Sequence, residues 1–221
     1  GGRKMLTGKR ISILGDSIST YKGVSNNADA NITTFINPCK YADPFPLEKT
    51  YWMQVINTFG MTLCVNNSWS GGNLSGKDDE SSGMNRAHQL ANNNGEKPEF
   101  IILFMGTNDL GRGVDPGIFE SDYRATLSVI KENYPAAVVC CINLPDRDIF
   151  LKPRAEIFNQ IIESAVNDAG NSFFIADLYR SRLNNDFYYM NTTDGIHPDE
   201  DGMKIIAEIV EDAIRKYFSI E

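Results

Sequence analysis

Short apolar runs alternate with longer stretches of helical periodicity along most of this chain. The apolar runs cover residues 10–14, 61–65, 100–105, 137–143 and 173–176. Each run is continuous rather than strictly alternating with polar residues, which is typical of strands covered on both faces. Such strands, when they alternate with helices, predict an α/β fold with a parallel sheet.

Three helices can be placed between and after these runs from the spacing of their apolar residues. The first carries Phe119, Tyr123, Leu127 and Ile130, and Pro135 ends it. The second is marked by Ile157, Ile161, Ile162 and Ala165. The third begins near Asp199 and has a stripe formed by Ile206, Ile209, Val210, Ala213, Ile214 and Tyr217.

We expect a single domain over residues 1–221, because the chain has no repeat, low-complexity tract or obvious linker. Residues 1–8 are expected to form a flexible leader, and a start without methionine leaves the cellular compartment open. The segment 21–50 is long, rich in Asn and Pro, and carries Tyr21, Phe35, Tyr41 and Phe45. It is expected to be an insertion loop near the functional site, either a lid or wall or a packed surface excursion.

Charge and hydropathy exclude several classes of function. The formal net charge is -8, which disfavours a nucleic-acid partner because phosphate binding requires a basic face. No apolar run approaches the roughly 18 residues that span a bilayer, so no integral membrane segment is expected. Neither property sets the oligomeric state.

The cysteines and histidines do not predict a metal site. Cys140 and Cys141 lie in an apolar run and are expected to be buried free thiols, and no pair that includes Cys39 or Cys64 has metal-site spacing. The chain has only two histidines, His88 and His197. No familiar metal spacing can be built from these residues.

A serine follows the first apolar run in the sequence Gly15-Asp16-Ser17. This position is the carboxyl end of a parallel strand, where open α/β sheets place their ligand crevice. A helix that starts there also directs free N–H groups toward negative charge. Taken alone, the tripeptide fits a helix N-cap slightly better.

Polar loops with glycines also follow the second and third apolar runs. Residues 106–109 read Gly-Thr-Asn-Asp, and Asn108 offers a neutral side-chain N–H donor suited to an oxyanion. Residues 66–73 include Gly71 and Gly72, and a glycine lets the backbone N–H approach a ligand closely. Each loop alone is also an ordinary turn, but three neighbouring strand ends of this kind indicate a convergent site.

His197 lies three residues after Asp194 in a glycine-containing loop near the end of the chain. A carboxylate at this spacing can hold the imidazole tautomer while the other ring nitrogen faces a serine. The alternative is a histidine that caps the final helix beside an ordinary Asp-Gly turn. His88 lies in a polar helical stretch and is expected to be solvated or structural.

These four blocks, in this order over residues 10–218, resemble the SGNH hydrolases of the GDSL esterase and lipase family. The resemblance implies a three-layer α/β/α domain with a five-stranded, mainly parallel, flavodoxin-like sheet. It implies Ser17 as nucleophile, His197 as base and Asp194 as its orienting carboxylate. It also implies an oxyanion hole from the N–H groups of Ser17 and Gly71 and the Asn108 side chain, with Gly72 as the alternative glycine, and it requires no cofactor or metal.

The expected function is therefore a serine esterase that acts through an acyl-enzyme on a small-molecule ester. Short acyl groups on a carbohydrate or similar polar alcohol are preferred as substrate, with Trp69, Asn73 and Tyr189 as expected substrate contacts. The alternatives are a thioesterase or lysophospholipase-type acyl hydrolase and a non-catalytic binding protein of the same fold. A metal-dependent phosphoesterase built from Asp16, Asn108, Asp109 and His197 is a further alternative.

Overall fold

The computed structural model describes residues 5–21, 45–146, 148–183 and 191–221. Its centre is one sheet of five parallel strands in the order β2-β1-β3-β4-β5. The strands are β1 (Arg10–Gly15), β2 (Thr62–Ser68), β3 (Phe100–Phe104), β4 (Val138–Ile142) and β5 (Phe173–Ala176). The predicted α/β class and parallel sheet are confirmed, and the chain reverses its direction of winding between β1 and β3.

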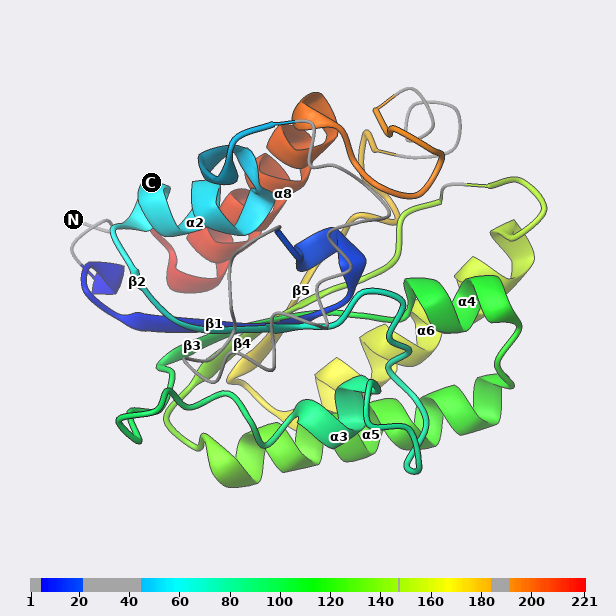
Figure 1. Ribbon diagram of the computed structural model, residues 1–221, viewed down its shortest axis with the longest axis horizontal. Coiled ribbons are helices and arrows are strands. Elements are labelled where there is room, and N and C mark those ends of the chain that lie inside the picture. The colour runs from blue at the N-terminus through cyan, green and yellow to red at the C-terminus, as the bar shows by residue number, and fades with distance from the viewer. Residues whose placement is uncertain (1–4, 22–44, 147, 184–190) are drawn as a thin grey trace.

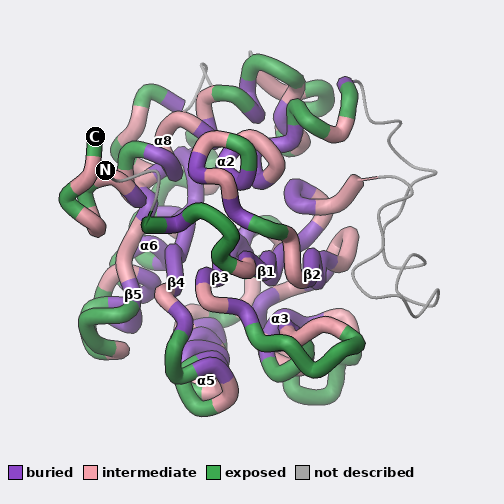
Figure 2. The backbone as a smooth tube through the Cα atoms, turned by 90° about the vertical axis from the view of Figure 1, so that its left-hand side faces the viewer, coloured by how far each residue is buried: buried purple, intermediate pink, exposed green. Residues whose placement is uncertain are grey.

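Helices cover both faces of the sheet and make three layers (Figure 1). One face carries α2 (Tyr51–Phe59) and α8 (Glu200–Phe218), and the other carries α3 (Gly83–Arg86), α5 (Pro116–Asn133) and α6 (Lys152–Ala169). Each helical layer packs against the sheet through its own cluster of buried apolar side chains. The central strands β1, β3 and β4 are buried between these layers (Figure 2), which explains their mostly apolar sequences.

The helices begin and end where capping residues satisfy their backbone groups. Thr50 accepts a hydrogen bond from the Met53 N–H at the start of α2, and Gly60 ends that helix in the left-handed conformation. Asp115 caps α5 ahead of Pro116, and Asp199 caps α8. The caps therefore fix where α8 starts, immediately after the segment that carries Asp194 and His197.

Two details of the sequence analysis differ from the structure: the end of β2 and the burial of one residue of α6. β2 continues to Ser68, so Asn66 and Ser68 are buried strand residues rather than members of the following loop. The Ser68 hydroxyl donates to the Asn66 Oδ1, and the Asn66 amide donates to the Ser19 carbonyl of η1 (Ser17–Ser19). These hydrogen bonds compensate the cost of placing polar groups in a buried strand. In α6, Ile157 is exposed, whereas Ile161, Ile162 and Ala165 are buried as predicted.

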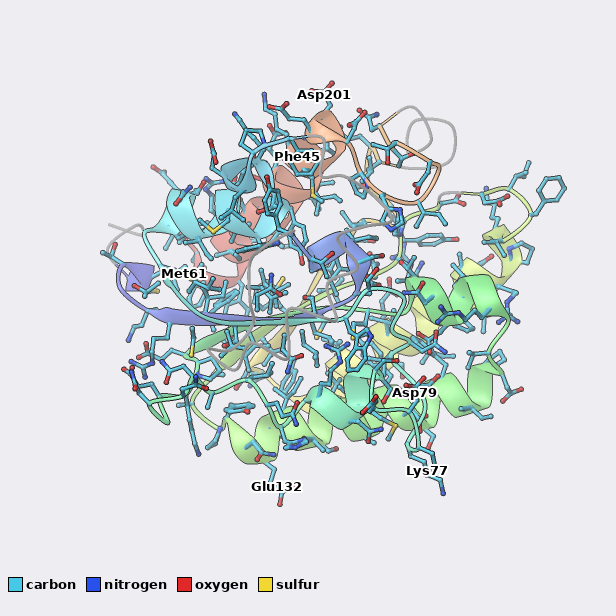
Figure 3. All side chains as sticks on the ribbon, viewed as in Figure 1. Phe45, Met61, Lys77, Asp79, Glu132 and Asp201 are labelled. Carbon is cyan, nitrogen blue, oxygen red and sulfur yellow. The ribbon has the colours of Figure 1, made fainter. Side chains whose placement is uncertain are left out.

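Parts of the expected leader and insertion loop pack into the protein. Leu6, within the segment 1–8, is 4% exposed and belongs to the apolar cluster on the α2 and α8 side of the sheet. Phe45, at the end of the segment 21–50, is buried in the same cluster (Figure 3). The Tyr21 hydroxyl donates a hydrogen bond to the Phe45 carbonyl oxygen. Residues 22–44 lie outside the described part of the chain, and the prediction of a lid or wall there stays untested.

Cys140 and Cys141 are buried free thiols in β4, as predicted, and burial raises the pKa of the Cys141 thiol to about 12. Cys64 is a free, half-buried thiol in β2.

Among the described residues, no helix combines the length and apolar character needed to cross a membrane.

Candidate active site

Ser17, His197 and Asp194 form a continuous hydrogen-bonded chain. The Ser17 Oγ lies 2.9 Å from the His197 Nε2, and the His197 Nδ1 lies 2.6 Å from the Asp194 Oδ2. Ser17 is half-buried, and the side chains of His197 and Asp194 retain 18% and 27% of their exposure. This is the order of contacts that a nucleophile, its base and an orienting carboxylate require.

Buried neighbouring residues hold the turn that carries Ser17 in place. Gly15 ends β1, and a Cβ there would come within 2.6 Å of the Ser19 side chain, so only glycine lets η1 fold back this closely. The Asp16 Oδ1 accepts the Ile18 N–H at 2.9 Å and caps η1. The Ser19 hydroxyl bonds the Tyr51 hydroxyl of α2 at 2.6 Å. Ser17 therefore sits on a rigid turn at the carboxyl end of β1.

Asp194 shapes the loop that brings His197 to Ser17. Its Oδ1 accepts the backbone N–H groups of Ile196 and His197, at 2.9 and 2.8 Å, while its Oδ2 faces the imidazole ring. Burial alone would raise the pKa of Asp194, but the hydrogen bonds from His197 and Ile196 outweigh it and hold this pKa below its ordinary value. Asp194 is therefore an anionic acceptor that selects the tautomer with the proton on Nδ1.

The register of the sheet brings the other predicted residues to the same edge. Gly15 pairs with Ser68 on one side and with Phe104 on the other, so β1, β2 and β3 end level with one another. Gly71 follows the end of β2, and Asn108 lies in α4 (Thr107–Arg112) after the end of β3. The predicted convergence of three strand-end loops is thus present in the backbone.

Hydrogen bonding distinguishes Gly71 from Gly72. The Gly72 N–H donates to the Trp69 carbonyl at 3.0 Å, whereas the Gly71 N–H has no partner among the described residues. Gly71 has a φ of +79°, which favours glycine at the third position of this turn. The Asn108 Nδ2 donates to the Gly72 carbonyl at 3.0 Å, which anchors the amide and leaves its second N–H available. Of the two glycines, Gly71 is therefore the one whose N–H is available to a ligand.

Asp109 holds the loop after β2 rather than a ligand. Its carboxylate is fully buried and accepts the N–H groups of Leu74 and Ser75, at 2.7 and 3.0 Å, and the Ser75 hydroxyl at 2.6 Å. A metal ion at Asp109 would have to break these bonds, so the arrangement disfavours the phosphoesterase alternative. Sequence reasoning treated this residue as part of a turn and missed its anchoring role.

Arg86 is a second buried residue that the sequence did not reveal. It is 2% exposed and donates to the Gly15 carbonyl at 3.0 Å and to the Asn67 carbonyl and side-chain oxygens at 2.7 and 3.0 Å. It therefore ties the carboxyl ends of β1 and β2 together. Burial lowers the pKa of the Arg86 guanidinium to about 10, which leaves it charged at neutral pH. Nothing in the polar stretch around it marks Arg86 as buried.

Asp16 directly precedes Ser17, and one of its carboxylate oxygens lacks a hydrogen-bond partner in the described part of the chain. This oxygen, the Oδ2, is buried. Burial raises the pKa of Asp16 from 3.8 to about 6, although the Ile18 N–H and the charges of His197 and Arg86 act in the opposite direction. A carboxyl whose pKa is raised on folding stabilises the fold below its unfolded pKa, and this stabilisation is lost as the pH rises through about 6.

We therefore expect Asp16→Asn to remove a pH-dependent loss of stability. Between pH 4 and pH 8 the wild type should lose about 2 kcal/mol of unfolding free energy that the variant retains, since one pKa unit corresponds to about 1.4 kcal/mol and part of the full difference is already lost at pH 4. Urea unfolding of both proteins at the two pH values measures this difference, and any pH-independent effect of the substitution cancels. Asp212→Asn, at an exposed position, is the control. Equal pH dependence in wild type and Asp16→Asn would contradict the expectation.

The expected substrate contacts are only partly described. Trp69 is half-buried and follows β2. Its backbone N–H donates to the Gly15 carbonyl at 3.1 Å, which places the residue beside the end of β1. Asn73 uses its side-chain oxygen to accept a hydrogen bond from Arg112. Tyr189 lies outside the described residues. His88 is exposed, and its carbonyl accepts the Tyr134 hydroxyl, so it takes no part in the arrangement around Ser17.

The chain is similar to known proteins in both sequence and structure. The family model described as GDSL-like lipase/acylhydrolase matches residues 9–214. No curated protein matches the chain significantly.

Solved structures of the same architecture include several esterases. A protein described as a GDSL-like lipase from Bacteroides ovatus has a TM-score of 0.72 and 23% identity, over 95% of this chain and 99% of its own. The esterase EstA from Pseudoalteromonas sp., solved with monoethylphosphonate as inhibitor, has a TM-score of 0.63 and 16% identity, over 96% and 99%. A carbohydrate esterase family 2 enzyme with a carbohydrate-binding domain, from Corynascus thermopiles (Myceliophthora fergusii), has a TM-score of 0.65 and 19% identity, over 96% and 67%. At these identities the likeness concerns the fold.

Proposed function

Because this chain belongs to the GDSL-like lipase/acylhydrolase family, a family of ester-bond hydrolases, we propose that it is a serine esterase that works through an acyl-enzyme. The observation that carries the proposal is the hydrogen-bonded chain from Ser17 through His197 to Asp194, at 2.9 and 2.6 Å. We propose as its substrates short acyl esters of carbohydrates or other small polar alcohols.

In the first half-reaction the Ser17 Oγ attacks the ester carbonyl carbon and forms a new C–O bond. The Ser17 proton moves to the His197 Nε2, and the Asp194 carboxylate stabilises the imidazolium that results. The carbonyl oxygen becomes an oxyanion, which the N–H groups of Ser17 and Gly71 and the Asn108 amide would stabilise. The tetrahedral intermediate then breaks its bond to the alcohol oxygen, and His197 returns the proton to that oxygen.

In the second half-reaction water replaces the alcohol. His197 accepts a proton from water as the water oxygen attacks the acyl carbon, and the same donors stabilise the second oxyanion. The bond between the acyl carbon and the Ser17 Oγ breaks, and His197 returns the proton to Ser17. The products are one alcohol and one carboxylic acid, and the cycle needs no group beyond water and these side chains.

Two features support a small, polar ester as substrate. Trp69 is half-buried and is the first residue of the turn that contains Gly71, where its ring can stack on a sugar. The segments after β2 and β3 also supply polar side chains: Asn108 donates to the Gly72 carbonyl, and Asn73 accepts a hydrogen bond from Arg112. Two carbohydrate esterases, from Corynascus thermopiles and Clostridium thermocellum, share the fold, which is consistent with this substrate class.

The proposal is tested with esters of different acyl length. We expect kcat/KM for p-nitrophenyl acetate to exceed that for p-nitrophenyl palmitate by about tenfold or more, and acetic acid to be released from acetylated xylose. The Ser17→Ala variant provides the blank for each substrate. A preference for palmitate would favour the lysophospholipase-type alternative, and no hydrolysis of any ester by the wild type would contradict the proposed function.

A further inference from the structure

One face of α4 holds the loop that contains Gly71. Its residues Asn108, Asp109 and Arg112 hydrogen-bond to five consecutive loop residues, 71–75. The Arg112 Nη1 donates to the Gly71 carbonyl at 2.6 Å and to the Asn73 Oδ1 at 2.7 Å. Asn108 and Arg112 are four residues apart and therefore lie on the same side of the helix.

The Gly71 turn needs such support because two adjacent glycines have little intrinsic rigidity. The turn is closed by the hydrogen bond from the Gly72 N–H to the Trp69 carbonyl, at 3.0 Å. Asn108 fixes the Gly72 carbonyl, but the Gly71 carbonyl is held by Arg112. The Gly71 N–H belongs to the preceding peptide, and its direction relative to the held carbonyl is set by the backbone torsions of Gly71. The contact with Arg112 therefore restrains the N–H by fixing the peptide on the other side of this residue.

The contacts of Arg112 indicate that its hydrogen bonds to the loop are not a by-product of a surface ion pair. Its side chain is exposed, and it forms no salt bridge within the described part of the chain. Both short contacts of its Nη1 instead go to the loop of Gly71. A charged donor on a carbonyl gives a stronger hydrogen bond than a neutral one, and the planar guanidinium directs it.

We propose that Arg112 is a positioning residue for the oxyanion hole. It holds the Gly71 carbonyl so that the N–H of the same residue stays directed at the oxygen that becomes negative during attack by Ser17. This inference rests on the proposed esterase function. Because its contribution is needed when the oxyanion forms, its loss should lower kcat more than it raises KM.

The kinetic test compares Arg112→Met and Arg112→Lys with the wild type on p-nitrophenyl acetate. A misplacement of about 1 Å can cost about 100-fold in rate, so we expect Arg112→Met to lower kcat by about 10- to 100-fold with KM changed by less than about threefold. Arg112→Lys keeps the charge and one donor and should recover part of the loss. Arg215→Met, which removes an arginine paired with Asp212 on α8, should leave the kinetics unchanged.

Amide hydrogen exchange at Gly72 gives a readout that is independent of turnover. We expect this exchange to be about tenfold or more faster in Arg112→Met than in the wild type, because the turn that protects the Gly72 N–H is loosened. Unchanged kinetics or unchanged exchange in Arg112→Met, with an active wild type, would overturn this proposal alone. An inactive wild type would overturn the proposed esterase function itself.

Discussion

Ser17→Ala is expected to lower kcat for p-nitrophenyl acetate by about 10⁴- to 10⁶-fold, because the substitution removes the atom that forms the acyl-enzyme. The His197 Nε2 loses its partner at 2.9 Å, but Ser17 is half-buried and its hydroxyl makes this one contact among the described residues. The unfolding free energy should therefore change by no more than about 1.5 kcal/mol. The loss is one of chemistry and not of folding.

Ser128→Ala is the matched control for Ser17→Ala. The Ser128 hydroxyl bonds to a carbonyl of its own helix, α5, and is exposed, so its removal should leave kcat unchanged. Urea unfolding establishes that both variants are folded. If Ser17→Ala retained the wild-type rate, Ser17 would not be the nucleophile, and the proposed mechanism would be wrong.

Asp194→Asn is expected to lower kcat by about 10⁴-fold while leaving the loop in place. An Asn side chain can still accept the N–H groups of Ile196 and His197 with its oxygen. Its NH₂ group then takes the position of the Oδ2, 2.6 Å from the His197 Nδ1, and acts as a donor there. The proton of neutral His197 moves to Nε2, which can no longer accept the proton of Ser17.

The control for Asp194→Asn is Asp201→Asn, which makes the same change at an exposed position in the first turn of α8 (Figure 3). It should retain the wild-type kcat. A decrease of tenfold or less in Asp194→Asn would mean that the carboxylate does not set the tautomer of His197. In that case the contact between Asp194 and His197 would serve the structure of the loop alone.

Much of the fold can be predicted because its signals are local. Each strand contains a short, mostly apolar run, and most buried residues of α5 repeat with helical spacing, as Phe119, Tyr123 and Leu127 do. The errors occurred where long-range contacts override local patterns. Asn66 is polar in sequence but lies in β2, because its side chain bonds to the Ser19 carbonyl 47 residues away.

In the candidate site, too, residues in short local motifs could be predicted, and residues that act through long-range contacts could not. Ser17, Asn108 and the pair Asp194 and His197 occur in short motifs with recognisable chemistry, and the structure brings them to one edge of the sheet. The residues that support them have no such signal. Arg86 and Arg112 donate to backbone carbonyls of distant segments. Every residue has a backbone carbonyl, so such an acceptor cannot be recognised from the sequence.

Labelling of Ser17 tests the central claim most directly. The wild type, Ser17→Ala and Ser128→Ala are each incubated with an activated alkylphosphonate. The masses of the intact proteins and of their proteolytic peptides are then measured by mass spectrometry. We predict one phosphonyl group per chain on the peptide that contains Ser17, present in the wild type and Ser128→Ala and absent from Ser17→Ala. A label on another residue, or no label on a folded wild type, would contradict the assignment of Ser17 as an activated nucleophile.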